Sequence, residues 1–106
     1  MVWDDDQAEI AEIIGSLRSQ DTDTRAVEVK AAAGGFPKKL VRSISAFANG
    51  TGGIIILGLD EDNGFVTVPG FDVTAMADAL AGACADHVTP SVRAQIDIVE
   101  WEGASI

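Results

Sequence analysis

The stretch AFANGTGGIIILGLD, residues 46–60, constrains the fold more than any other part of the chain. A segment with helical spacing runs into a glycine cluster, and an almost wholly apolar strand follows and ends on an acid. Glycine-rich loops hold phosphate when they lead from a strand into a helix N-terminus, whose N–H groups face the anion. Here the order is reversed, and the nearby helix end carries a partial negative charge. The glycines therefore indicate a helix stop and a strand start, with Asn49 or Gly50 in the left-handed conformation.

The remaining pattern predicts an α/β (α+β) fold, in which a compact mixed sheet of about four strands is packed by about three helices. The expected order is helix, strand, helix, strand, strand, helix, strand. Pro37 is placed to begin the second helix, and Asp72 or Thr74 to cap the third. The expected elements are a helix at 4–19, a strand at 25–33, a helix at 37–50, a hairpin of 53–60 with 65–70, a helix at 72–88 and a strand at 91–103.

The length of 106 residues corresponds to a single domain, residues 1–106. The last residues, EGASI, read as a turn and the start of a partner strand, so we expect the chain to be the N-terminal part of a longer protein. The single cysteine, Cys84, cannot form an internal disulfide. No signal peptide and no apolar run of about 20 residues is present. We therefore expect a cytoplasmic protein that does not enter a membrane.

The net charge of −10 argues against nonspecific adhesion to nucleic acid or to an anionic membrane. The charge is uneven, however: residues 25–53 carry five bases and one acid, Glu28, while both flanking regions are strongly acidic. This window is either a solvated helix face or a local basic patch. Its bases are Arg25, Lys30, Lys38, Lys39 and Arg42.

Zinc and nucleophile signals are weak in this chain. His87 is the only histidine, and Cys84 lies three positions before it on the same expected helix. A zinc site needs more ligands than this pair supplies, and Cys84 has no histidine placed to activate it as a nucleophile. No cofactor is expected from these residues.

The segments RAVEVK, LVRSISAFANGTGGIIILGLDEDNG and VPGFD resemble the Schlafen-like divergent Alba domain, which bacteria carry as a DNA-binding domain of predicted transcriptional regulators. The family pattern has an acid-Ser pair, a Val/Leu-Glu-Phe-Lys strand, a helix ending in Ala-Phe-Ala-Asn, a Gly-Gly pair and an apolar strand ending in Gly-Val-Asp. The resemblance covers roughly residues 22–100.

The resemblance implies binding to the phosphates of DNA or RNA, often by a homodimer. The five bases of the 25–53 window are the implied phosphate contacts. Such contacts contribute affinity but do not read sequence.

The resemblance also implies an alternative, the divalent-metal-dependent ribonuclease activity of some animal Schlafen proteins, which use three acids. These map onto Asp23, Glu28 and Asp60, which would hold Mg²⁺ or Mn²⁺ to activate water. Asp23 stands where the family has Glu, so its carboxylate reaches one methylene less. Structural explanations remain open, because Glu28 can pair with Lys30 or Arg25, and Asp60 can be a hairpin-turn residue.

A third hypothesis is a non-enzymatic domain that mediates dimerisation or contacts a protein partner. It agrees best with the acidic composition. The sequence thus leaves open whether the protein is an enzyme, and it places nucleic-acid binding first.

Overall fold

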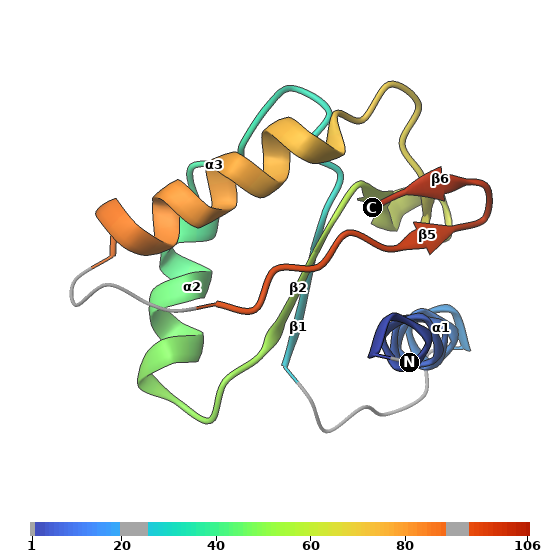
Figure 1. The fold of residues 1–106 in the computed structure, drawn as a ribbon, viewed down its shortest axis with the longest axis horizontal. Coiled ribbons are helices and arrows are strands. Elements are labelled where there is room, and N and C mark those ends of the chain that lie inside the picture. Colours follow the sequence, from blue (N-terminus) through green and yellow to red (C-terminus); the bar gives the residue numbers. More distant parts are fainter. Residues whose placement is uncertain (1, 20–25, 89–93) are drawn as a thin grey trace.

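A computed structural model describes residues 2–19, 26–88 and 94–106, and it has an α+β architecture (Figure 1). The predicted order of elements is confirmed, except that the strand expected at 53–60 is divided in two and a short additional strand follows the last expected one. The helices in these residues are α1 (Val2–Ser19), α2 (Leu40–Asn49) and α3 (Val73–Asp86), with a 3-10 turn at Glu61–Asn63. The strands are β1 (Val27–Lys30), β2 (Ile54–Leu57), β3 (Leu59–Asp60), β4 (Val66–Thr67), β5 (Glu100–Trp101) and β6 (Ala104–Ser105).

The strands form three two-stranded ladders in the described residues, where the sequence had predicted one sheet. β1 and β2 run parallel, with Val27 opposite Ile54 and Lys30 opposite Leu57. Parallel neighbours need a crossover connection, and the segment that contains α2 supplies it. β3 and β4 form a hairpin at the predicted turn that is shorter than the expected pairing of 53–60 with 65–70, because residues 54–57 pair with β1. β5 and β6 form a second hairpin near the end of the described residues.

Gly58 separates β2 from β3. Its φ of +100° lies in a region that L-residues with side chains rarely adopt. Ile56 and Leu59 both contribute to the core beneath α1, although strict alternation would place residues 56 and 58 on one face. Gly58 thus changes the direction of the side chains that follow it, and the ladder restarts as a hairpin.

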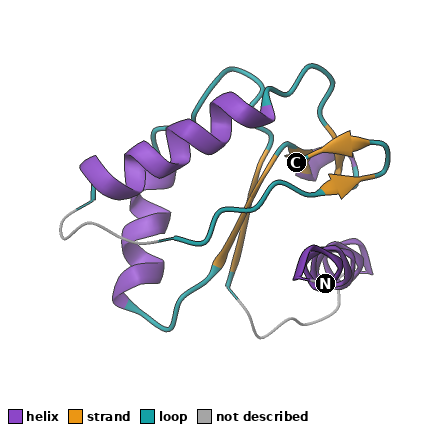
Figure 2. Ribbon diagram, viewed as in Figure 1, coloured by secondary structure: helices purple, strands orange, loops and turns teal. Residues whose placement is uncertain are grey.

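In the described part of the chain, the core consists of two clusters on opposite faces of the β1–β2 pair. Ile13 and Ile14 of α1 pack against Val29 and Ile56 on one face. On the other face, Ile44 of α2 contacts the α3 residues, and the partly buried residues of this second cluster include strand residue 55. Figure 2 shows α1 on one side of the central strands and the α2–α3 pair on the other.

Two expectations at helix ends need correction. α2 begins at Leu40 and not at Pro37, because the intervening residues form a turn in which the Leu40 N–H donates to the Pro37 carbonyl (3.0 Å). After α2, Gly50 has a φ of −111°, and the positive φ (+91°) falls on Gly52. The Gly52 N–H donates to the Phe47 carbonyl, so the chain reverses two residues later than predicted.

Of the two predicted caps of α3, Asp72 is confirmed: its carboxylate accepts from the Ala75 N–H (3.0 Å).

Two expected strands are shorter than predicted. β1 ends at Lys30, because Ala32 adopts a φ of +54° and the Gly35 N–H closes a turn onto its carbonyl. The strand expected at 91–103 includes only β5 among the described residues. Residues 94–98 have no ladder partner there, and Val99 exchanges two backbone hydrogen bonds with Ile106 (3.1 and 2.9 Å). The turn expected in EGASI is confirmed and joins β5 to β6.

Arg18 ties α1 to both hairpins. Its guanidinium donates to the carbonyls of Gly64 and Phe65 (3.0 Å each) and to both carboxylate oxygens of Glu102 (2.6 and 3.1 Å). It also lies 5.5 Å from the centre of the Trp101 ring, within the range of a cation–π contact. A bidentate geometry of this kind is stronger than an ordinary surface ion pair.

We expect the Arg18–Glu102 pair to make stability depend on pH. The hydrogen bond from Arg18 lowers the pKa of the Glu102 carboxyl below its ordinary value of 4.5. A depressed pKa stabilises the folded state above the unfolded pKa, and this contribution is lost as the pH falls through the folded pKa. Glu102→Gln should therefore be less stable than the wild type at neutral pH and should show a flatter pH profile in the acid range.

Urea denaturation midpoints, measured at a series of pH values, test this expectation. Asp78→Asn, at an exposed position of α3, is the control and should follow the wild-type profile. Parallel profiles for Glu102→Gln and the wild type would contradict the assigned role of the pair.

Candidate nucleic-acid interface

Three basic side chains are exposed at the start of α2: Lys38, Lys39 and Arg42, here called the α2 basic cluster. Residues three and four apart lie on the same side of a helical turn, so Arg42 follows both lysines on one face. The opposite face is anchored by Leu40 and Ile44, which are buried. This alternation places the three cations on the solvent side of the helix.

The residues that flank the α2 basic cluster in the sequence include no acid that could compensate its charge. Residues 29–59 include neither Asp nor Glu, and the first turn of α2 has no acid. A helix N-terminus carries a partial positive charge that acids normally offset, so the cluster adds charge of the same sign. No hydrogen bond or ion pair from these three side chains to another described residue is present. The arrangement favours an anion from outside the chain.

The backbone contributes less to such a site than the side chains do. The N–H groups of Leu40, Val41 and Arg42 donate to the carbonyls three residues earlier, at 3.0 to 3.4 Å. They are therefore already engaged in the turn that leads into α2. An anion here would be held by flexible cationic side chains, which neutralise charge without imposing a fixed geometry.

Lys30 differs from the α2 basic cluster, because its ammonium group lies 2.9 Å from the Glu28 carboxylate. The hydrogen bond and the charge of Glu28, with a smaller contribution from Glu61, raise the pKa of Lys30. Residues two apart on a strand share a face, and the pairing with Lys30 that the sequence offered as a structural explanation for Glu28 is confirmed. Lys30 is already partnered by acids and is the weaker candidate for a phosphate contact.

Asp60 takes part in the hairpin turn. Its carboxylate accepts from the Asp62 N–H (3.1 Å) and from the Asn63 side-chain amide, and it caps the 3-10 turn. This is the hairpin-turn explanation that the sequence left open. Both carboxylates described from the predicted acidic trio thus have partners within the chain.

The remaining predicted site residues, Asp23 and Arg25, lie outside the described residues. Glu28 lies opposite Ile55 in the β1–β2 ladder. Ile55 is five residues before Asp60 in the chain. Among residues 2–19, 26–88 and 94–106, no group of three or more His, Cys, Asp or Glu side chains could hold a metal ion. The metal role of the trio stays a prediction.

Cys84 has the properties of a packing residue. It is buried among Ile44, Ala83 and Val88, and burial raises the pKa of its thiol. A protonated, enclosed thiol is a poor nucleophile and a poor metal ligand. His87, three positions on, is exposed at the end of α3.

The sequence model of the Schlafen, AlbA_2 family matches residues 23–106, which is most of the chain. The chain belongs to the Schlafen AlbA_2 family. The matched region of this AlbA_2 domain includes β1, α2 and the β3–β4 hairpin, so the α2 basic cluster lies within the family's shared part. The family indicates a nucleic-acid-binding domain. No curated protein and no solved structure gives a significant match to the chain.

No described helix of the AlbA_2 domain is both long enough and apolar enough to cross a membrane.

Proposed function

We propose that the chain is a DNA-binding domain of a bacterial transcriptional regulator and that it contacts phosphates through the α2 basic cluster. The observation that carries the proposal is the set of three exposed cations, with no acidic partner among the described residues, at the positive end of a helix. Family membership supports the same class of ligand. Lys30 takes a secondary place because Glu28 neutralises it.

The net charge of −10 reduces nonspecific binding but is compatible with a local contact. Charges are screened beyond a Debye length of about 8 Å at physiological ionic strength. A phosphate in contact with Lys38, Lys39 or Arg42 therefore responds mainly to its immediate neighbourhood. Overall repulsion by the remaining acids would limit binding at other positions on the surface and would favour one orientation of the nucleic acid.

A homodimer forms part of the proposal, because two copies would double the number of phosphate contacts and approach two segments of one duplex. Phosphate contacts from a single cluster contribute little sequence discrimination. Light scattering of the purified protein, with and without a DNA duplex, measures the stoichiometry.

The test of the proposed function is a filter-binding titration of the protein with duplex DNA and with RNA between 50 and 200 mM salt. We expect DNA to be retained, and its observed affinity to fall on a log–log plot with a slope of about −0.9 for each phosphate neutralised. No retention at low salt, or an affinity that does not change with salt, would overturn the proposed contact. A stable dimer that retains no nucleic acid would favour the dimerisation hypothesis.

The ribonuclease hypothesis gives a separate expectation. Glu28 is paired with Lys30 and Asp60 is engaged in its turn, so neither carboxylate is free for a metal without local change. We expect structured RNA incubated with Mn²⁺ to give the same products with the wild type and with Glu28→Ala. Gel electrophoresis of end-labelled RNA measures this, and cleavage by the wild type that the variant loses would revive the ribonuclease assignment.

A further inference from the structure

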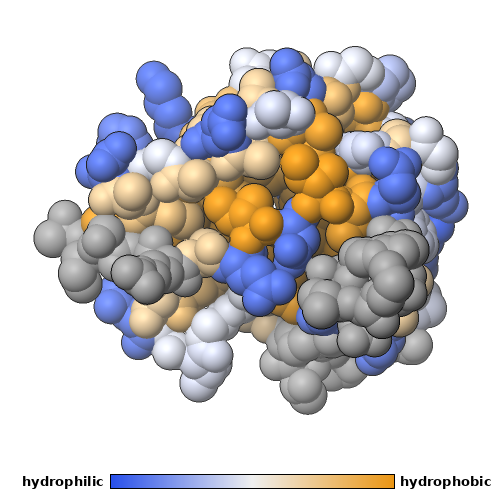
Figure 3. All heavy atoms as spheres, viewed as in Figure 1, coloured by the Kyte–Doolittle hydropathy of each residue, from blue (hydrophilic) through white to orange (hydrophobic). Residues whose placement is uncertain are grey.

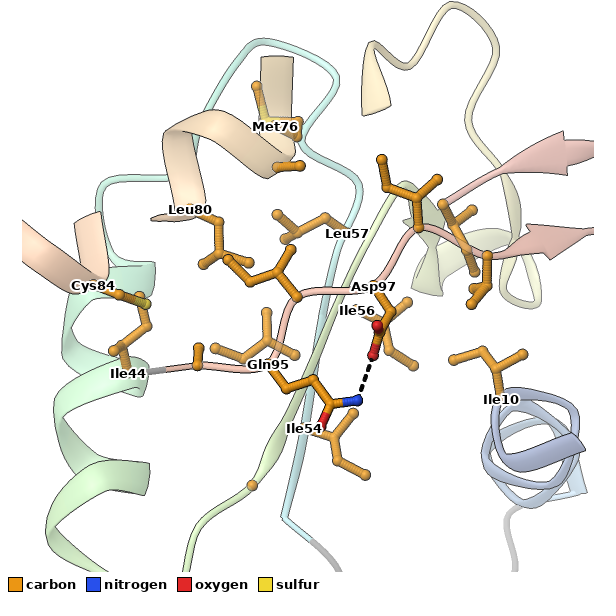
Figure 4. Close-up of a pocket in the computed structure, with 18 of the residues that line it drawn as sticks. Ile10, Ile44, Ile54, Ile56, Leu57, Met76, Leu80, Cys84, Gln95 and Asp97 are labelled. Carbon is orange, nitrogen blue, oxygen red and sulfur yellow. Dashed lines mark hydrogen bonds between the residues drawn. The ribbon is translucent and has the colours of Figure 1, made fainter. Parts of the chain in front are cut away.

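An apolar groove of about 660 Å³ runs along β2. Figure 4 shows Ile10 of α1 on one side, Ile44 and Leu80 of the α2–α3 pair on the other, and residues 94–99 crossing in front of the strand. Figure 3 shows hydrophobic residues gathered at the centre of the same face. A hollow of this size and character on one face marks a binding region more often than a packing defect.

The strand in this groove has one unused edge. The Ile54 N–H donates to the Ala26 carbonyl (2.8 Å) and the Gly58 N–H to the Lys30 carbonyl (2.9 Å), so these groups face β1. Because N–H directions alternate along a strand, the N–H and C=O groups of Ile55 and Leu57 point to the opposite edge. Among the described residues, no strand pairs with that edge.

Residues 94–99 line the groove without completing the sheet. Gln95 donates to the Asp97 carboxylate (3.0 Å), and this contact between residues two apart shows that the segment is extended. The side chain of Ile98 is 52 % exposed, although it lies beside the apolar wall. The segment therefore leaves apolar surface available next to an open strand edge.

The charge of the groove selects among possible occupants. Among the residues that the structure describes, the charged side chains in its lining are Glu9 of α1 and Asp97 of the crossing segment, and both are exposed acids. The basic residues described above do not line it. An occupant with lysine or arginine beside its apolar residues would complement this lining, whereas a neutral or acidic one would not.

We propose that this groove binds an extended peptide segment of a partner protein, with alternating apolar and basic residues, as an added strand on β2. The free groups of Ile55 and Leu57 would supply main-chain hydrogen bonds, the apolar walls would take every second side chain, and Glu9 and Asp97 would face the basic ones. The site is distinct from the α2 basic cluster in position and in charge. It therefore gives the domain a protein-binding surface in addition to the proposed nucleic-acid surface.

Amide hydrogen exchange tests the strand edge directly and carries its own control. In the protein alone, the amides of Ile55 and Leu57 should exchange at least tenfold faster than those of Ile54, Ile56 and Gly58, which face β1. The probe acetyl-Val-Lys-Val-Lys-Val-amide should protect the two fast amides and leave the other three unchanged. Equal protection of all five in the free protein, at every protein concentration, would show that the chain already covers the edge and would overturn the proposal.

A rise in protection of Ile55 and Leu57 with protein concentration would assign the edge to a second copy of this chain, and would also overturn the proposal.

Two versions of the probe peptide, with N-methyl groups at its odd-numbered or at its even-numbered residues, separate hydrogen bonding from apolar contact. We expect only one of the two to lose binding by tenfold or more, since only one presents blocked amides to β2. Undiminished binding of both would show a purely apolar site and contradict strand addition.

Charge reversal provides the matched protein variant. Both acids are exposed, so Glu9→Lys combined with Asp97→Lys should fold as the wild type does by circular dichroism. This variant should bind the lysine probe about tenfold more weakly, and should bind a glutamate version of the probe more tightly than the wild type does. Equal affinity of the wild type for the lysine and glutamate probes would remove the charge assignment.

Discussion

Replacement of Lys38, Lys39 and Arg42 by glutamine is expected to remove most of the salt-dependent affinity for duplex DNA. Each phosphate contact contributes about 0.9 to the log–log salt slope, so the triple variant should lose about 2.7 for each protomer bound. Between 50 and 200 mM salt, the affinity of the wild type should therefore fall by about 40-fold more per protomer than the affinity of the variant. Filter binding of one duplex across this range measures the difference.

Single substitutions provide the matched control, because each removes one positive charge. Lys39→Gln should reduce the slope by about 0.9, whereas Lys30→Gln should reduce it by much less, since Glu28 already partners Lys30. Equal effects of the two would show that net charge, and not the α2 basic cluster, controls binding. The three cluster positions are exposed, and loss of cations from a helix N-terminus does not destabilise the helix, so folding should be preserved.

Gly58→Ala is expected to produce the largest loss of stability at a position outside the apolar core clusters. A methyl group at this position would lie 2.8 Å from the Phe71 ring, and the φ of +100° is itself unfavourable for alanine. Backbone strain of about 1–3 kcal/mol and overpacking of about 1–3 kcal/mol together lower the free energy of unfolding by about 2–6 kcal/mol. Urea denaturation with linear extrapolation measures it.

Gly70→Ala separates the two causes. Gly70 also has a positive φ (+75°), but a methyl group there meets no atom within 4 Å. This control should lose about 1–2 kcal/mol from backbone conformation alone. Adding Phe71→Leu to Gly58→Ala should recover part of the larger loss, because the smaller side chain can move away. No recovery, with equal losses at Gly58 and Gly70, would show that the Phe71 contact has no energetic role.

Local features of this chain were accessible from the sequence because their causes lie within a few residues. The alternation in β1, the hairpin after Asp60 and the Asp72 cap each depend on short-range spacing and hydrogen bonding, and each is confirmed. The family pattern in residues 46–60 was likewise readable, and the match over residues 23–106 agrees with it. Element ends were less accessible: Ala32 and Gly52 adopt conformations that no simple spacing specifies.

For the candidate site, the sequence predicted which residues take part but not which of them are available to bind a ligand. The sequence grouped five bases and three acids, and it could not rank them because pairing depends on which side chains share a face and a distance. Within the described residues, the tertiary structure assigns Lys30 to Glu28, engages Asp60 in a turn, and leaves the α2 basic cluster exposed. Both pairings join residues two or three apart in the chain, so the spacing allowed them and the folded geometry decided that they form.

The sequence by itself determined the class of the domain, the order of its elements and its family, since these follow from hydrophobic period, glycine placement and a local motif. Only the tertiary structure decided that Gly58 divides β2 from β3, that α1 and the α2–α3 pair cover opposite faces, and that one edge of β2 borders an apolar groove. These features arise where segments distant in the chain meet. Their free energies depend on packing and on hydrogen bonds that local sequence does not encode.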